Sequence, residues 1–363
     1  MAYTDIDDSS AYFTTTLWTG DGTSSGRSIT NDANAGDFKP DWLWIKPRAG
    51  TNATHHQLYD SSRGVSKSLR SSATAAEIEN SAYGYVSAYD TNGFTSIAGS
   101  NNNENINENS STFVAWQWKA NGGTTASNTD GTITSTVQAN TTAGFSIATY
   151  TGNGTEGATF GHGLGVAPKL VIVKGRSNAD NWAVFNGTST TASRSLHLEG
   201  TDAEIPVSSY NFWNLYWDET YPSSSVVTLG VDAKVNGNTN TYVSYCFAEK
   251  QGYSKIGKYI GNGSADGTFV YTGFKPAWVM CKSTASTSDW YIYDNKREGY
   301  NVDNDHLLAN STAVEATADE IDMLSNGFKL RIATDPNVAE AYIYMAFAEH
   351  PFVSSKGVPT TAR

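Results

Sequence analysis

The chain has 363 residues and a formal net charge of -12, with 24 Lys and Arg against 36 Asp and Glu. Phosphate binding needs clustered basic residues, and the sequence has no such run, which argues against a nucleic-acid partner. No stretch approaches the roughly 18 apolar residues of a membrane span. The acidic first eight residues also lack the apolar core of a signal peptide, so we expect neither membrane insertion nor secretion by that route.

The composition favours β-structure. Aromatic residues make up 12% of the chain and charged residues only 17%, while Gly, Ser, Thr and Asn dominate the rest. Aromatic and β-branched residues fit a pleated, half-buried surface, and Gly and Asn supply turns. The composition therefore predicts many short strands joined by turns.

Four landmarks recur three times in the same order along the chain. The first is a glycine turn, at residues 20–22, 152–154 and 261–263. The second is a proline, a spacer, four mainly apolar residues and a lysine, at 40–46, 168–174 and 276–282. The third is Thr-x-x-Glu, at 74–77, 201–204 and 317–320. The fourth is an aromatic strand, at 113–118, 242–247 and 342–347. Ordered landmarks in three copies indicate one ancestral domain used three times.

The spacing of the copies predicts three tandem domains. The prolines are more than 100 residues apart, far above the roughly 20 to 50 residues of solenoid units, so each copy can bury its own core. We expect the divisions that follow: repeat 1 over 1–122, a linker or docking strand over 123–143, repeat 2 over 144–251, repeat 3 over 252–350, and a tail over 351–363. The alternation in 132–137 is the reason for keeping the docking strand as an alternative.

Local patterns predict the architecture within each repeat. Each Thr-x-x-Glu matches a capping box, which predicts a helix of one or two turns there. Elsewhere the period is two: Val114, Trp116 and Trp118 share one face of a strand, and Ile343 and Met345 do the same in repeat 3. We expect three antiparallel β-sandwiches of jelly-roll, lectin-like type, with at most short helical turns.

Candidate catalytic and metal-binding residues are few. His55 and His56 are adjacent, so on a strand they point to opposite faces and one metal ion could hardly take both. Asp60 precedes Arg63 by three residues, which favours a turn with a local ion pair over a catalytic carboxylate. The glycine turns are better explained as hairpin turns than as calcium sites, since calcium takes 6 to 8 oxygen ligands. We predict no catalytic residue, no metal and no cofactor.

The two cysteines, Cys246 and Cys281, fall on predicted core strands of different repeats. We expect both to be buried free thiols, because free Cys behaves as a small hydrophobe. A chain with so few cysteines gains nothing from disulfides and suits assembly in a reducing cytoplasm.

One aromatic segment, residues 210–218, breaks the repeat pattern because it occurs only in repeat 2. Both of its faces are aromatic, so it predicts either a binding surface for protein or glycan or a segment buried between domains. Its candidate binding residues are Tyr210, Phe212, Trp213, Tyr216 and Trp217.

Several motifs together resemble a known family. They are IDDSSAYF at 6–13, PDWLWIK at 40–46, DSSRG at 60–64, NGF at 92–94, VAWQWK at 114–119, GFSIATYTG at 144–152, GHGL at 161–164 and AFAEHPF at 346–352. This set is similar to tail-fibre or virion-associated proteins of marine and cyanobacterial tailed phages. The resemblance covers almost the whole chain and implies a virion structural role, a lectin-like sandwich and no known catalytic residues. Repeat 2 departs most, because it lacks the Asp-Arg-Gly block.

The resemblance and the residues together predict a non-enzymatic virion protein of the tail, fibre or adhesion apparatus, made in the host cytoplasm. The expected partners are other virion proteins in a homo-oligomer or symmetric assembly, with host-cell glycans as a further candidate. Two alternatives remain open at this point: a capsid-decorating or head-fibre protein, and a polysaccharide-degrading tailspike enzyme.

Overall fold

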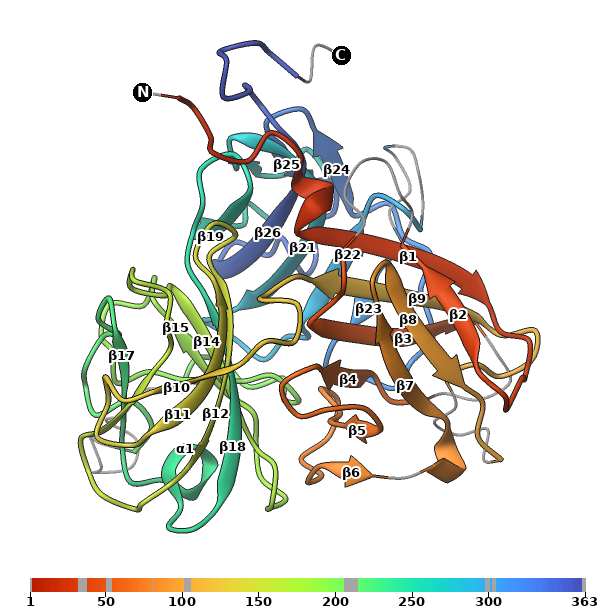
Figure 1. Ribbon diagram of the computed structural model, residues 1–363. Helices are drawn as coiled ribbons and strands as arrows, with labels where there is room; N and C mark the ends of the chain where they lie inside the picture. Colours follow the sequence, from red (N-terminus) through yellow and green to blue (C-terminus); the bar gives the residue numbers. More distant parts are fainter. Residues whose placement is uncertain are drawn as a thin grey trace.

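A computed structural model describes residues 2–31, 38–49, 54–79, 81–100, 106–205, 215–297, 301 and 305–360 (Figure 1). Helical structure in these ranges is confined to α1 (Ala233–Asn236) and two 3-10 turns, η1 (Ser9–Ala11) and η2 (Ser81–Tyr83). The prediction of an all-β chain with at most short helical turns is therefore confirmed. No helix in the described ranges is long and apolar enough to cross a membrane.

Repeat 1 contains two main sheets. The larger has the order β1-β9-β3-β4 and the smaller the order β2-β8-β7, with a separate β5-β6 pair. The strands are β1 Phe13–Thr19, β2 Arg27–Thr30, β3 Trp42–Ala49, β4 Gln57–Asp60, β5 Lys67–Ser68, β6 Ile78–Glu79, β7 Tyr85–Asp90, β8 Gly93–Ile97 and β9 Thr112–Trp118.

Repeats 2 and 3 follow the same plan. The larger sheets are β10-β11-β12-β18-β14-β15-β16 and β19-β26-β21-β22-β23, and the smaller ones are β13-β17 and β20-β25-β24. Repeat 2 and its connecting segment contain β10 Ala126–Asn128, β11 Ser135–Asn140, β12 Phe145–Thr151, β13 Ala158–Gly161, β14 Leu170–Gly175, β15 Ala183–Asn186, β16 Leu196–His197, β17 Val226–Leu229 and β18 Thr241–Phe247. Repeat 3 contains β19 Ser254–Ile260, β20 Phe269–Tyr271, β21 Phe274–Ser283, β22 Tyr291–Asp294, β23 Leu307–Leu308, β24 Ile321–Leu324, β25 Gly327–Leu330 and β26 Ala341–Pro351.

The three larger sheets share one central core. Each sheet turns one face inward, and these faces meet in a single apolar cluster. Prominent members are Trp42, Trp44, Trp116 and Trp118 of repeat 1, Ile172, Tyr245 and Phe247 of repeat 2, and Trp278, Met345 and Phe347 of repeat 3. The ring of Trp42 stacks on that of Tyr245 with centroids 4.5 Å apart, and Trp118 meets Trp278 edge-on at 5.6 Å. The repeats are therefore held together by a common interior.

The opposite face of each larger sheet packs on the smaller sheet of its own repeat. Leu43 and Ile45 of β3 lie in one such cluster with Phe94 of β8. Separate clusters fill the corresponding space in repeats 2 and 3. Since both faces of each larger sheet are buried, the strands after the repeated prolines read as continuous apolar runs rather than alternating ones.

The glycine turns connect the two layers of each repeat, and they are not hairpins as predicted. In each case the strand before the turn belongs to the larger sheet and the strand after it to the smaller one. A buried asparagine bonds to the turn: Asn107 accepts from Asp21 N, Asn236 from Asn153 N and Asn337 from Asn262 N. The last glycine of each turn has a positive φ, between 63° and 70°, that favours glycine.

The connecting segment between repeats 1 and 2 forms β10 and β11, which extend the larger sheet of repeat 2. β11 pairs with β12 so that Gln138 lies opposite Ile147. The Gln138 amide donates to the hydroxyls of Ser61 (2.8 Å) and Ser62 (2.7 Å) in repeat 1. The added strand thus contacts both repeats.

The described residues before β1 do not pair with β1 as β11 pairs with β12. Instead Tyr3 donates from its hydroxyl to the carbonyl of Gly273 in repeat 3 (2.6 Å), and Asp7 accepts from Ser355 N (2.6 Å). Both ends of the chain lie on the same side of the molecule (Figure 1).

We expect Asn236→Ala to lower the free energy of unfolding by about 3 kcal/mol, because it leaves buried polar groups without partners. The Asn236 amide donates to Thr155 O and Gly230 O, both at 2.9 Å, and accepts from Asn153 N at 3.0 Å. Urea unfolding followed by tryptophan fluorescence measures the change. The exposed Asn238 serves as the matched control, and equal losses for Asn238→Ala and Asn236→Ala would contradict the assignment.

Candidate functional site

The most concentrated buried charge in the described chain lies where the repeats meet. We call the contact of repeats 1 and 2 the first seam, that of repeats 2 and 3 the second seam, and that of repeats 3 and 1 the third seam. Each seam combines side chains from two repeats, so each is assembled only when the chain has folded as a whole.

The first seam begins with the local pair that the sequence predicted. Asp60 ends β4, and the turn after it brings Arg63 back so that Arg63 N donates to Asp60 Oδ1 (2.8 Å) and Arg63 Nε pairs with Asp60 Oδ2. Both side chains are fully buried. Burial alone would lower the pKa of Arg63, but the adjacent Asp60 carboxylate raises that pKa well above its ordinary value. The guanidinium therefore stays charged inside the protein.

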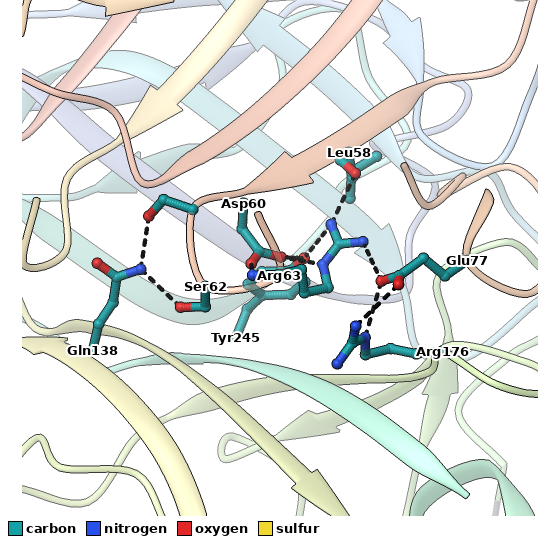
Figure 2. Close-up of polar contacts among 9 residues, drawn as sticks. Leu58, Asp60, Ser62, Arg63, Glu77, Gln138, Arg176 and Tyr245 are labelled. Carbon is teal, nitrogen blue, oxygen red and sulfur yellow. Dashed lines mark hydrogen bonds and ion pairs between the residues drawn. The ribbon is translucent and has the colours of Figure 1, made fainter. Parts of the chain in front are cut away.

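The network continues across the seam into repeat 2 (Figure 2). Tyr245 donates its hydroxyl to Asp60 Oδ2 (2.7 Å), and Arg63 Nη1 donates to Glu77 Oε2 (2.9 Å). Arg176 of repeat 2 donates two hydrogen bonds to the same Glu77 carboxylate, from Nε (2.9 Å) and from Nη2 (3.0 Å). Burial opposes ionisation of Glu77, yet the hydrogen bond from Arg176 and the charge of Arg63 hold its pKa below the ordinary value. Negative and positive groups thus alternate from one repeat to the next.

The third seam repeats this arrangement with different residues. Asp294 and Arg297 form the fully buried pair, and Arg297 Nη1 donates to Glu315 Oε2 (2.9 Å). Arg48 of repeat 1 supplies the second arginine on Glu315, with Nη2 2.8 Å from Oε1. Trp116 Nε1 donates to Asp294 Oδ2 (2.9 Å), in the role that Tyr245 has in the first seam.

The second seam keeps the backbone contact, but among the described residues no arginine of repeat 3 binds its glutamate. Glu204 N donates to Thr284 O (3.1 Å), just as Glu77 N donates to Arg176 O in the first seam. Thr284 stands where the other seams have an arginine, and Asn186 replaces the aspartate. The Glu204 carboxylate instead bonds within its own repeat, to Asn186 (3.2 Å) and to Arg194 (3.5 Å).

The predicted capping boxes are wrong. No helix forms at 74–77, 201–204 or 317–320. Glu77 binds two arginines instead of capping a helix. The Thr74 carbonyl accepts a hydrogen bond from Lys174 across the seam. The equivalent motif of repeat 3 is Thr312-x-x-Glu315, five residues before the predicted one. The spacing of the capping box is present, but burial beside arginines decides what the glutamate does.

The lysine of each repeated strand reaches across a seam. All three are fully buried. Lys174 Nζ donates to Thr74 O (3.2 Å), Lys282 Nζ to Thr201 O (3.1 Å) and Lys46 Nζ to Thr312 O (3.1 Å). Burial lowers the pKa of Lys46 to about 7 and those of Lys174 and Lys282 to about 8.

A ring N–H makes a third contact in every seam. Trp182 Nε1 donates to Arg70 O (2.8 Å) in the first seam, and Trp290 Nε1 donates to His197 O (2.9 Å) in the second. In the third seam the ring is His56, whose Nε2 lies 2.9 Å from Leu308 O.

The bonds of His56 define its tautomer. Trp44 Nε1 donates to His56 Nδ1 (2.7 Å), and burial holds the pKa of His56 well below its ordinary value. The imidazole is therefore neutral, with its proton on Nε2 toward the Leu308 carbonyl. Neighbouring His55 bonds to Ser72 Oγ instead (2.9 Å). Within the described ranges no group of three His, Cys, Asp or Glu side chains is placed to hold a metal ion.

The predicted aromatic binding segment is only partly described. Tyr210, Phe212 and Trp213 lie outside the described residues. Tyr216 is 8% and Trp217 1% exposed, and both pack in the cluster between the two sheets of repeat 2. These two residues therefore present little or no surface to a ligand, and they pack within their own repeat rather than between domains. A binding role for the other three stays a prediction.

The cysteines are confirmed as buried free thiols. Burial raises the pKa of each to about 12, so neither is a reactive thiolate at neutral pH.

The charged residues of the first and third seams bond to one another and hold neighbouring repeats together. The carboxylates of Asp60 and Asp294 are fully buried and already bonded to arginine, so they are not placed to exchange protons with a substrate. The sequence revealed the local Asp-Arg pairs. It did not reveal that Lys46, Arg48 and their counterparts lie across a seam, although the lysine ending each apolar run was the available signal.

The fold and its seams define a single-chain β-protein of three interlocked repeats. A family model described as a domain of unknown function, DUF7483, matches residues 8–351. The chain belongs to this family. Searches of curated proteins and of solved structures returned no match. The matched residues span all three repeats.

We expect Glu77→Gln to lower the free energy of unfolding by about 3 kcal/mol, since it leaves Arg63 and Arg176 without their shared carboxylate in a largely buried site. Urea unfolding measures the loss. Asp266→Asn is the control, because the Asp266 side chain is 85% exposed in its pair with Lys329. A Glu77→Gln protein as stable as the control protein would show that the seam charge is dispensable.

The buried lysines predict a pH dependence. Between the folded pKa of about 7 for Lys46 and the unfolded value near 10.4, the unfolded chain binds a proton that the folded chain has released. Stability therefore rises with pH in this window, by up to about 1.4 kcal/mol per pH unit for each lysine.

Lys46→Met removes one such group. From pH 7 to pH 9 the variant should gain roughly 2 kcal/mol less stability than the unmodified protein. Its lost hydrogen bonds lower stability equally at each pH and do not affect this difference. Urea unfolding at pH 7, 8 and 9 measures it, with the exposed Lys258→Met as control. Parallel pH profiles for the Lys46→Met and unmodified proteins would refute the linkage.

Proposed function

We propose that this chain is a non-enzymatic structural component of a bacteriophage particle, in the tail, fibre or adhesion apparatus. The observation that carries the proposal is the use of the buried charged residues. Asp60 and Glu77 bond to Tyr245 and Arg176 of repeat 2, and their third-seam counterparts Asp294 and Glu315 bond to Trp116 and Arg48 of repeat 1. Such an arrangement supports a rigid scaffold. The motif resemblance to virion-associated proteins supplies the biological setting.

The surface of repeat 3 supports contact with other proteins. Ile260 is 62% exposed at the end of β19, and Phe269 on β20 is 45% exposed. Tyr271, two residues after Phe269 on the same exposed face of β20, is 50% exposed. Exposed apolar groups that gather in this way favour a partner surface.

Labelling of intact phage particles tests the proposal. Immunogold with antibodies against the purified protein should mark the tail or its fibres. Label on the head surface would instead favour a capsid-decorating or head-fibre protein, and unlabelled particles would overturn the virion role. Host polysaccharide shortened by the purified protein would favour the tailspike enzyme.

A partner surface on repeat 3 makes a separate prediction. Phe269→Ser should reduce incorporation into particles at least fivefold while lowering the free energy of unfolding by no more than about 1 kcal/mol, because nearly half of this residue is already exposed (45%). Quantitative immunoblots of purified particles measure incorporation. Val231→Ser, at an exposed position of repeat 2, is the control. Equal incorporation of the Phe269→Ser and control proteins would exclude this surface.

A further inference from the structure

A cleft of about 260 Å³ lies in the third seam, between repeat 3 and the N-terminal part of repeat 1, where Asp7, Asp8 and Ser10 line it beside β1. Phe13, Thr14 and Thr15 of β1 line one side. Ala277, Asn295 and Lys296 of repeat 3 line the other. The cleft is separate from the ion network of this seam, whose charged members do not line it.

The internal symmetry of the chain shows what occupies the corresponding place in the first seam. Phe13 pairs with Trp118 as Phe145 pairs with Phe247, so β1 corresponds to β12 and Thr15 to Ile147. In repeat 2, Ile147 lies opposite Gln138 of the added strand β11.

The far wall of the cleft corresponds in the same way. Asn295 and Lys296 follow Asp294 as Ser61 and Ser62 follow Asp60. In the first seam, both serine hydroxyls accept from the Gln138 amide (Figure 2). The cleft therefore lies where β11 would pass if the third seam had such a strand.

The edge of β1 is available for pairing. β1 pairs with β9 alone among the described strands. Tyr12 O accepts from Lys119 N, and Gly20 N donates to Ser111 O, so the even-numbered residues of this strand face β9. The N–H and C=O of Thr15 therefore point away from β9, toward the unpaired edge.

Thr15 adds an independent indication of a ligand. Its side chain is only 4% exposed, and its hydroxyl oxygen has no hydrogen-bond partner in the described structure. The corresponding residues of repeats 2 and 3 are Ile147 and Ile256, which are buried in the central core. A buried hydroxyl without a partner costs about 1 to 3 kcal/mol. A ligand in the cleft that bonds to it would remove that cost.

We propose that this cleft binds an extended segment of a partner polypeptide, which adds as a strand to the edge of β1. The residue opposite Thr15 takes the place that Gln138 has in the first seam. A glutamine there can bond both to the Thr15 hydroxyl and to Asn295. Backbone pairing supplies affinity, and the side chain in the cleft supplies specificity.

A synthetic peptide with the sequence of residues 132–142 is the probe, because β11 already fits the equivalent place. Fluorescence anisotropy with the full-length protein should show saturable binding of the labelled peptide. Gln138→Ala in the peptide should weaken binding at least fivefold. Thr15→Pro in the protein should weaken it at least tenfold, since proline removes the edge N–H yet is tolerated on an edge strand. Lys258→Pro on the edge of β19 is the matched control and should bind normally.

A crosslink provides a second measurement should Thr15→Pro fail to fold. In a peptide with Gln138→Cys held as a mixed disulfide with thionitrobenzoate, the Thr15→Cys thiolate should attack the peptide sulfur and release thionitrobenzoate, because directly paired strand residues lie within disulfide reach. Lys258→Cys measures the reaction of an exposed thiol without the cleft: its rate should rise linearly with peptide concentration, whereas the Thr15→Cys rate should be higher and should saturate. Absence of saturable binding together with equal crosslinking at both sites would overturn the proposal.

This inference deepens the proposed function, on which it rests for the identity of the partner. The outcomes are separable. Particles that label while the peptide does not bind would overturn only the cleft. Peptide binding with unlabelled particles would overturn only the virion role.

Discussion

Burial of charge between repeats is the constraint on which the rest of the structure depends. Once Arg63 and Arg297 lie inside the protein, each must be surrounded by carboxylates and carbonyls from more than one segment. These carboxylates and carbonyls belong to the arginine's own repeat, and docking adds a second arginine from the neighbouring repeat, Arg176 on Glu77 and Arg48 on Glu315. The shared apolar core supplies the attraction between repeats, and the seams determine which face of each repeat meets its neighbour.

The contacts between repeats explain why the three repeats form one structural unit. Each has its own apolar cluster between two sheets, which would favour independent folding. Yet one face of every larger sheet lines the common interior. An isolated repeat would therefore expose Trp42, Tyr245 or Phe347 to water. The match of one family model to residues 8–351 agrees with an assembly that is kept whole.

Much of the fold was predictable because its signals are local. Alternation placed Trp116 and Trp118 on one face, and both lie in the central core. The three-residue spacing of Asp60 and Arg63 predicted their pairing. The role of Glu77 was not predictable in this way, because Thr-x-x-Glu has the same spacing whether it caps a helix or binds Arg176, which is 99 residues away in the sequence. The burial of Trp217 likewise depends on packing against residues distant in the sequence, which no local pattern identifies.

The second seam, in which no described arginine of one repeat binds a carboxylate of the other, also differs in how its repeats are covalently linked. β18 ends at Phe247 and β19 begins at Ser254, so a very short connection holds repeat 3 against repeat 2 at a high effective concentration. The first seam is bridged by the longer run between Trp118 and Phe145, and the third joins repeats that are not consecutive in the chain. The two strong charge networks thus occur where covalent linkage constrains docking least. The short link between repeats 2 and 3 removes chain entropy before docking, so this seam needs less stabilisation from ion pairs between repeats.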